Sequence, residues 1–187
     1  MRIDPNKTWR LVEERLAAET NPRRRRNLEL VLAHMQAEAR ADIEGVVATL
    51  SDRPKYITHG RAGEAPLNPD GSKDAVREFY DLTIVQTGAH RLEFDCDRVI
   101  VDDEAVFTEG VMRMAYPGRT LAALGIAVDD PEAFYVMETR MGVVWPVDAD
   151  DPEGRLRGEE VYSGMDGFEG IADRKIQLSD IAALQLA

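Results

Sequence analysis

The sequence predicts an α+β protein. Apolar residues recur at helical spacing through most of the first half of the chain, whereas apolar and polar residues alternate over much of residues 92–163. Helices followed by a run of strands are typical of an antiparallel sheet with helices packed on one face. With 187 residues, the chain is long enough to bury a core without cross-links. We therefore expect a four- to five-stranded antiparallel sheet.

Local signals mark the first helices. Asp4-Pro5 resembles an N-cap followed by a proline at the first helical position, which predicts a helix to about Glu19. Asn21-Pro22 ends that helix and begins a second one. The second helix is expected to break or kink near Ala41-Asp42 and then to continue to about Leu50.

The rest of the chain alternates between loop and strand signals, with one further helix. A short strand is expected at residues 54–59, a loop at 60–72 and a helix at 74–86. Asp102-Asp103 predicts a tight turn between two strands. Residues 117–132 are long for a hairpin loop, which predicts a lid. The four longer strands are expected at residues 92–101, 105–116, 134–147 and 156–163.

Composition limits the function classes. The net charge of −12 argues against a nucleic-acid partner, because phosphate binding needs clustered positive charge. Cys96 is the single cysteine, so no intrachain disulfide is expected and a reducing compartment fits. No apolar run is long enough for a membrane span, and the N-terminus lacks the apolar core of a signal peptide. We expect a cytoplasmic protein without a membrane partner.

The sequence carries no signal for a metal or a cofactor. Its three histidines, His34, His59 and His90, lack the spacing of metal ligands. No glycine-rich phosphate loop or G-x-S-x-G motif occurs. Any chemistry is therefore expected to use side chains alone, with no metal and no cofactor.

The order of elements resembles the nuclear-transport-factor-2-like superfamily, and within it the SnoaL-like polyketide cyclases and the ketosteroid isomerases. Three segments carry the resemblance: ADIEGVVATL at residues 41–50, DAVREFY at 74–80 and GRLR at 154–157. The resemblance implies a cone-shaped fold in which a curved antiparallel sheet wraps around helices and encloses an apolar pocket. Residues 27–187 would form this domain, and residues 1–26 would add an N-terminal helical extension.

The resemblance also implies a homodimer, since members usually pair through the outer face of the sheet. Alternation places apolar and charged residues together on that face, a mixture that suits a self-complementary interface. The expected residues are Phe107, Val111, Phe134, Val136 and Val144, among Glu109, Arg113, Glu138 and Arg140.

Two helical residues are the first candidates for catalysis. His34 stands where the isomerases place the tyrosine that donates a hydrogen bond to the substrate oxyanion, and imidazole can also exchange protons near neutral pH. Tyr80 matches a tyrosine that supports that donor, so we expect the two side chains to project into the cone within hydrogen-bond reach. The alternatives are a structural histidine and an ordinary core tyrosine.

The first strand departs from the isomerase pattern. Thr58 stands where the isomerases have their aspartate base, with His59 beside it, and Met141 stands at their second acid. Strand alternation puts Tyr56 and Thr58 on one face, so His59 reaches the pocket mouth only if the strand bends or slips. Isomerase chemistry with the usual residues is therefore not expected.

Epoxide hydrolysis is not expected either. The epoxide hydrolases of the superfamily use an Asp-Arg-Asp set on neighbouring strands. The matching positions here hold Gly110, Met112 and Val161.

The remaining pocket residues are expected to be mostly apolar, and a methionine-rich face adapts to irregular apolar ligands. The last strand adds one acid. Family resemblance points Glu159 into the pocket, whereas plain apolar alternation points Glu160 there, so the two compete. A glutamate in an apolar cone would have a raised pKa and serve as acid or base. The further expected pocket residues are Met112, Met137, Thr139, Met141 and Trp145.

Two functions remain open. One is a small cofactor-independent lyase, isomerase or cyclase that acts on an apolar carbonyl compound, with His34, Tyr80 and Glu159 as its catalytic residues. The other is a non-catalytic module of the same fold that binds an apolar small molecule. A polar cluster inside the cavity would favour the enzyme, and a dry methionine-lined cavity would favour the binding module.

Overall fold

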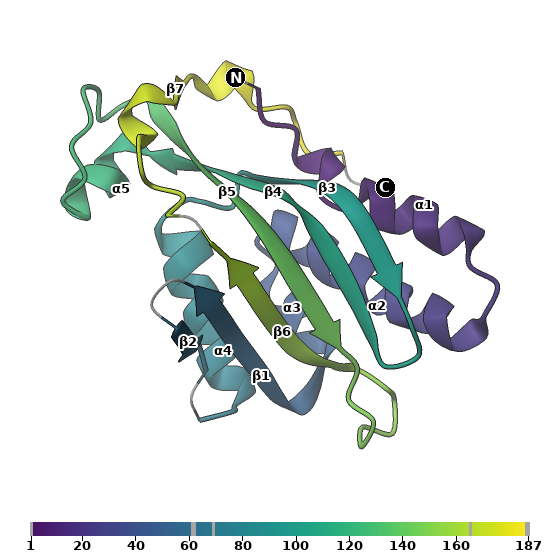
Figure 1. The fold of residues 1–187 in the computed structure, drawn as a ribbon. Coiled ribbons are helices and arrows are strands. Elements are labelled where there is room, and N and C mark those ends of the chain that lie inside the picture. The colour runs from purple at the N-terminus through teal and green to yellow at the C-terminus, as the bar shows by residue number, and fades with distance from the viewer. Residues whose placement is uncertain (1, 61–62, 69, 165, 186–187) are drawn as a thin grey trace.

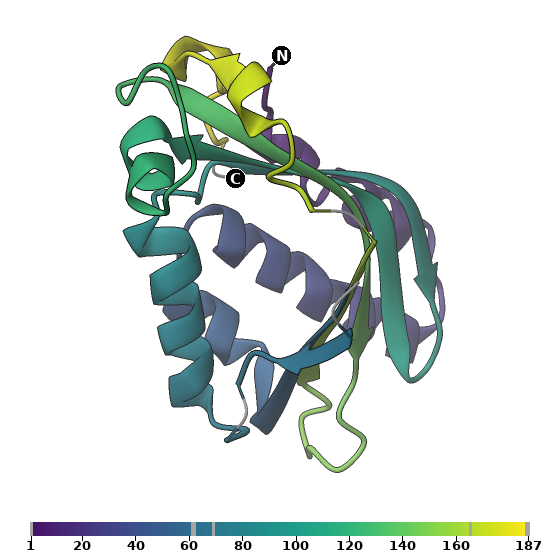
Figure 2. The same cartoon turned by 60° about the vertical axis from the view of Figure 1, so that its left-hand side comes forward.

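One strongly curved sheet wraps around three helices, α2, α3 and α4 (Figures 1 and 2). The structure is a computed structural model that describes residues 2–60, 63–68, 70–164 and 166–185. The main core lies on the concave side of the sheet, between the sheet and these helices. The α+β cone expected from the sequence is confirmed.

The N-terminal segment is divided where a single helix was expected. A 3-10 helix, Pro5–Lys7, begins at Asp4, whose side chain accepts a hydrogen bond from the backbone N–H of Asn6. The α-helix α1, Arg10–Ala18, follows separately and packs against α2 and β3. The interruption is at Thr8, whose buried hydroxyl accepts a hydrogen bond from the backbone N–H of Phe94 at 3.2 Å. A tertiary contact has overridden the local helical signal here.

The next two helices follow their local signals. Helix α2 covers Pro22–Ala39, and Asn21 caps it by accepting from the backbone N–H groups of Arg23 and Arg24. The expected break falls at Ala41, which has a positive φ of 54°. Helix α3, Ile43–Ala48, then ends before Leu50 because the chain turns into a strand there.

The remaining helices lie at the open side of the cone. Helix α4 covers Lys73–Tyr80 and continues as a π-helix, Asp81–Gln86. Helix α5, Gly118–Ala123, lies within the expected lid. Leu121 of α5 is fully buried in a cluster with Tyr116 and Tyr135, so part of the predicted loop is an ordered helix.

The sheet is larger than expected and is mixed. Its order is β2-β1-β6-β5-β4-β3, with β7 paired to β5, so it has seven strands within the part of the chain described. Strand β1 runs parallel to β6, whereas the other pairs are antiparallel. The prediction of four to five antiparallel strands was therefore wrong in number and in this pairing. The strands are β1 Leu50–Gly60, β2 Gly63–Pro66, β3 Leu92–Val101, β4 Ala105–Pro117, β5 Phe134–Pro146, β6 Leu156–Ser163 and β7 Lys175–Ile176.

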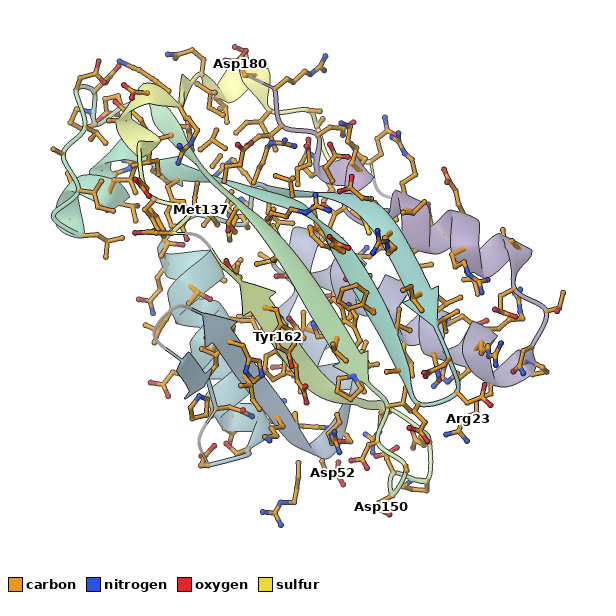
Figure 3. All side chains as sticks on the ribbon, in the orientation of Figure 1. Arg23, Asp52, Met137, Asp150, Tyr162 and Asp180 are labelled. Atoms are coloured by element: carbon orange, nitrogen blue, oxygen red, sulfur yellow. The ribbon has the colours of Figure 1, made fainter. Side chains whose placement is uncertain are left out.

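The chain's own ends cover part of the outer face that was expected to be open. The backbone of Ile3 pairs with residues 180–182, which places the N-terminal residues beside the yellow C-terminal segment (Figure 1). Ile3 and Ile176 pack on Val136, which is fully buried. The outer face remains accessible farther along the sheet, where Tyr162 is exposed (Figure 3).

No helix among the described residues combines the length and the apolar character that a membrane crossing requires.

Candidate active site

The concave side of the sheet encloses a cavity of about 460 Å³. Methionines and aromatic rings supply most of its wall, with a few hydroxyl and carboxyl groups between them. Such a wall suits an apolar small molecule that is held at a few polar points. The methionines are Met35, Met112, Met114, Met137 and Met141, and the aromatic residues are Tyr56, Phe79, Tyr80, Phe94, Tyr116, Trp145 and Phe168.

Most of the expected pocket residues line this cavity, but not all do. Thr58 lines it, as do the expected methionines, Tyr56 and Trp145. Thr139 is buried beside the cavity, where its hydroxyl lies 3.0 Å from that of Ser163. His59 is not among the residues of the wall, and its ring stacks on Tyr162 with 4.4 Å between the ring centres. The strand does not bend enough to bring His59 inward.

His34 lies behind the cavity wall and not in it. Its side chain is fully buried, and its Nδ1 is 2.8 Å from the hydroxyl of Thr49. That hydroxyl already donates to the backbone carbonyl of Val46, so it can only accept from His34. Nδ1 therefore carries a hydrogen, and Nε2 is the atom that faces the site. The expected hydrogen-bond contact between His34 and Tyr80 is confirmed, but His34 does not line the cavity itself, because Tyr80 and Glu159 stand between it and the cavity.

Nε2 of His34 meets two groups of the cavity wall. It lies 3.2 Å from the hydroxyl of Tyr80 and 3.0 Å from Oε1 of Glu159. The Tyr80 hydroxyl donates to the same Oε1 at 2.7 Å. The 3.0 Å contact between the ring and the carboxyl group requires a proton on one of them. Glu159, which lines the cavity, is thus joined to a buried group that can exchange a proton with it.

The backbone at Gly158 decides which glutamate faces inward. Gly158 has a φ of +123°, and the β1–β6 register shifts just before it, between the pairs that join Leu50 to Leu156 and Lys55 to Gly158. This irregularity resets the alternation, so Leu156 and Glu159 are both buried although they are three positions apart. Glu160 is half-buried on the other side of the strand. Plain alternation predicted the reverse because it assumes a regular strand.

Glu38 is a site residue that the sequence analysis missed. It follows His34 by one helical turn on α2, lines the cavity and is half-buried by the surrounding protein. Desolvation raises the pKa of its carboxyl group to about 8, and the nearby charge of Glu159 adds to the shift. Among the described residues, none forms a hydrogen bond or ion pair with this carboxyl group. The i,i+4 spacing places Glu38 on the same helix face as His34, and this spacing could have identified it from the sequence.

Tyr56 adds a further polar group to the cavity wall. Its hydroxyl is buried and donates no well-formed hydrogen bond to a described residue, although Tyr80 and Glu159 are its polar neighbours and Tyr56 lines the cavity. Burial and the charge of Glu159 hold the pKa values of Tyr56 and Tyr80 well above their usual range. Both phenols therefore keep their protons at neutral pH and can donate hydrogen bonds.

The described residues contain no group of three or more histidine, cysteine, aspartate or glutamate side chains that could hold a metal ion. The polar side chains of the described wall are the carboxyl groups of Glu38 and Glu159, the phenols of Tyr56, Tyr80 and Tyr116 and the hydroxyl-bearing side chains of Thr8, Thr58, Thr83 and Ser163, with His34 behind them.

Comparisons with known proteins place this fold. No family model and no curated protein matches the sequence. Solved structures do match. One is an LEH-like epoxide hydrolase from Mycobacterium tuberculosis, with 17% identity and a TM-score of 0.56; the match covers 82% of this chain and 94% of that one. Another is a candidate SnoaL-like polyketide cyclase from Jannaschia sp. CCS1, with 15% identity and a TM-score of 0.55; the match covers 78% of this chain and 90% of that one. A third is a Mycobacterium tuberculosis protein in complex with estradiol-17β-hemisuccinate (17%, TM-score 0.52, 73% and 92%).

These likenesses show that the chain has the nuclear-transport-factor-2-like fold of the SnoaL-like proteins, as the sequence resemblance implied. At this level of identity they show the fold alone, and the function has to be argued from the site.

Proposed function

We propose that this protein is a small cofactor-independent enzyme, a lyase, isomerase or cyclase, that moves a proton on an apolar carbonyl compound. The observation that carries the proposal is Glu159. Its carboxyl group stands in the wall of an apolar cavity and is held from behind by Tyr80 and His34. A fixed carboxyl group with a buried proton-exchange partner is the arrangement that acid–base catalysis needs.

The first chemical step would be removal of a proton from the carbon next to the carbonyl group. Glu159 takes this proton, and the electron pair of the broken C–H bond forms the C=C bond of an enolate. The electrons of the C=O bond move onto its oxygen, where the hydroxyl of Tyr56 can donate a hydrogen bond. Return of the proton to another carbon completes an isomerisation. Ring closure would instead follow when the enolate carbon attacks a second carbonyl carbon of the same molecule, the electron pair of that C=O bond moves onto its oxygen, and that oxygen takes the proton.

His34 would act through Glu159 and not on the substrate. It is fully buried behind the wall, and its Nδ1–H is fixed by Thr49, so Nε2 is the ring atom that exchanges a proton with Glu159. As the other carboxyl oxygen of Glu159 takes the substrate proton, the proton between Oε1 and Nε2 moves onto Nε2. His34 is therefore a positioning and proton-holding residue. Tyr80 orients the same carboxyl oxygen.

Exchange of substrate hydrogen for deuterium tests the proposal without knowledge of the natural substrate. A fluorescent naphthyl ketone, 6-acetyl-2-(dimethylamino)naphthalene, carries exchangeable hydrogens beside its carbonyl group. Wild-type protein in D₂O should accelerate deuterium uptake into the acetyl group, measured by mass spectrometry. His34→Ala should slow this uptake by roughly 10-fold or more, because the proton-holding group is lost. A wild-type rate equal to the buffer rate, in a sample that binds the ketone, would contradict the proposal.

The second candidate function is a non-catalytic module that binds an apolar small molecule. Its support is the methionine-rich, mostly apolar wall of the cavity. A structural neighbour was solved in complex with a steroid ester. Binding of the naphthyl ketone without any catalysed deuterium uptake would favour this function.

We also propose that the protein forms a homodimer through the uncovered part of the outer face, around Phe107 and Tyr162. The covered part near Val136 cannot take part, because residues of the chain's own ends pack there. Light scattering at micromolar concentration should give twice the mass of one chain. A monomer mass would rule out this assembly.

A further inference from the structure

The cavity contains acidic side chains and no basic ones among its described residues. Of the residues in its wall, Glu38 and Glu159 are the acids, and none is lysine, arginine or histidine. The nearest basic group is His34, which is engaged behind the wall by Thr49 and Glu159. A negatively charged ligand in this cavity would therefore meet no free basic group that could neutralise it.

The two acids differ in their partners. Glu159 receives a hydrogen bond from Tyr80 and contacts His34. The carboxyl group of Glu38 has neither a hydrogen bond nor an ion pair with any described residue, although the backbone carbonyl of Glu38 accepts from the backbone N–H of Ala41. An unpaired carboxyl group in an apolar wall is the more sensitive of the two to whatever enters the cavity.

The surroundings of Glu38 contain nothing that would balance its charge. Glu159 faces it from β6, Tyr56 from β1 and Tyr80 from α4. On its own helix, His34 lies one turn earlier, and Asp42 at the start of α3 shares a small adjoining hollow with it. These groups are acids, phenols and a histidine that already contacts Thr49 and Glu159.

We propose that this cavity, whose described wall has acids and no basic side chain, is selective for ligands without negative charge, so that it takes an apolar ketone or aldehyde and rejects the matching carboxylate or phosphate ester, and that Glu38 strengthens this selectivity where it ionises. The inference concerns the same cavity and rests on the proposed function. It narrows the substrate class to uncharged carbonyl compounds.

The selectivity follows from the cost of burying a negative charge without a partner. A ligand carboxylate would lose its hydration in a site of low dielectric, where no basic side chain of the described wall can pair with it. A neutral ketone avoids this cost, and its oxygen can accept a hydrogen bond from the hydroxyl of Tyr56. The expected difference in Kd is about 10-fold or more.

Glu38 also makes ketone affinity depend on pH. The pKa of Glu38, raised to about 8 by burial and by Glu159, keeps it neutral near neutral pH. An apolar ligand strips water from the carboxyl group, which disfavours the ionised form further. Ligand binding is therefore linked to protonated Glu38, and ketone affinity should fall as the pH rises through about 8.

A matched pair of fluorescent probes tests the proposal. One is 6-acetyl-2-(dimethylamino)naphthalene, and the other is 6-(dimethylamino)-2-naphthoate, which replaces the acetyl group with a carboxylate. Fluorescence titration should give their Kd values at about pH 6 and about pH 9.5 for wild type, Glu38→Gln and Glu29→Gln. Glu29 lies on the same helix but is exposed, so it controls for the loss of one charge.

Wild type and Glu29→Gln should bind the ketone about 10-fold or more tightly than the carboxylate at pH 6, and should lose ketone affinity at pH 9.5. Glu38→Gln should bind the ketone equally at both pH values and should bind the carboxylate more tightly than wild type does at pH 9.5. Equal affinity of wild type for the two probes would overturn the proposal, as would no ketone binding at pH 6 or an unchanged pH dependence in Glu38→Gln.

Unfolding provides a readout that needs no ligand. Glu38 is neutral in the folded protein and ionised in the unfolded chain between about pH 4.5 and 8, so wild type loses stability relative to Glu38→Gln as the pH rises through that range. The denaturation midpoint of Glu38→Gln should exceed that of wild type by more at pH 8 than at pH 5. A constant difference would show that the pKa of Glu38 is not raised in the folded protein.

The results separate this inference from the proposed function. Charge selectivity without catalysed deuterium uptake would leave the inference standing and defeat the enzyme proposal. Catalysed uptake with equal binding of both probes would do the opposite.

Discussion

Replacing Glu159 with glutamine is expected to slow deuterium uptake into the naphthyl ketone by roughly 10²–10⁴-fold, the usual contribution of a positioned acid or base. The amide keeps the size of the side chain and can still accept from Tyr80, whose hydroxyl lies 2.7 Å from Oε1. It cannot take a proton from carbon. Ketone binding should therefore survive while exchange is lost, and rates measured at saturating ketone distinguish the two effects.

Glu160→Gln is the matched control, because Glu160 is the next residue on the same strand and is half-buried on its other side. This variant should exchange at the wild-type rate. Equal losses in the two variants would place the effect in the strand as a whole. Normal exchange by Glu159→Gln would remove Glu159 from the mechanism.

Replacing Gly158 with alanine is expected to destabilise the fold by roughly 2–4 kcal/mol, a large effect for one methyl group. An added Cβ would lie 2.2 Å from the backbone oxygen of Lys55, and the φ of +123° is one that L residues rarely adopt. The clash is with backbone, so no side-chain rotation relieves it. Urea denaturation should show a lower midpoint for this variant.

Gly164→Ala provides the comparison for this measurement, since a Cβ there would meet nothing within 4 Å. Its unfolding midpoint should stay within experimental error of wild type. Any folded Gly158→Ala protein should also have weakened exchange, because Glu159 follows directly in the strand. A midpoint of Gly158→Ala equal to that of Gly164→Ala would show that the irregularity in β6 is not constrained as described.

Local patterns predicted the elements whose causes are local. The strands at residues 92–101 and 156–163 have the expected bounds, because alternation of apolar and polar residues reports directly on a half-buried strand. The start of α2 was predicted because Asn21 caps the helix by itself. Residues 74–80 led to the correct fold because they show helical spacing and also resemble a helix of the family.

Local patterns could not predict contacts between residues that lie far apart in the sequence. The parallel pairing of β1 with β6 joins residues about a hundred positions apart, and the short strands β2 and β7 exist only because β1 and β5 offer edges to them. The predicted N-terminal helix was interrupted by a contact between Thr8 and Phe94. Each of these features depends on a partner that no local window contains.

The sequence by itself determined the class of fold, most strand and helix positions, and the candidate set of His34, Tyr80 and Glu159. Only the tertiary structure decided that His34 stands behind the wall, that Glu159 rather than Glu160 faces the cavity, and that Glu38 joins the cavity as an unpaired acid. The physical reason is that periodicity assigns a side chain to a face of its own element. Its burial, its partners and its pKa depend on what the other elements place opposite that face.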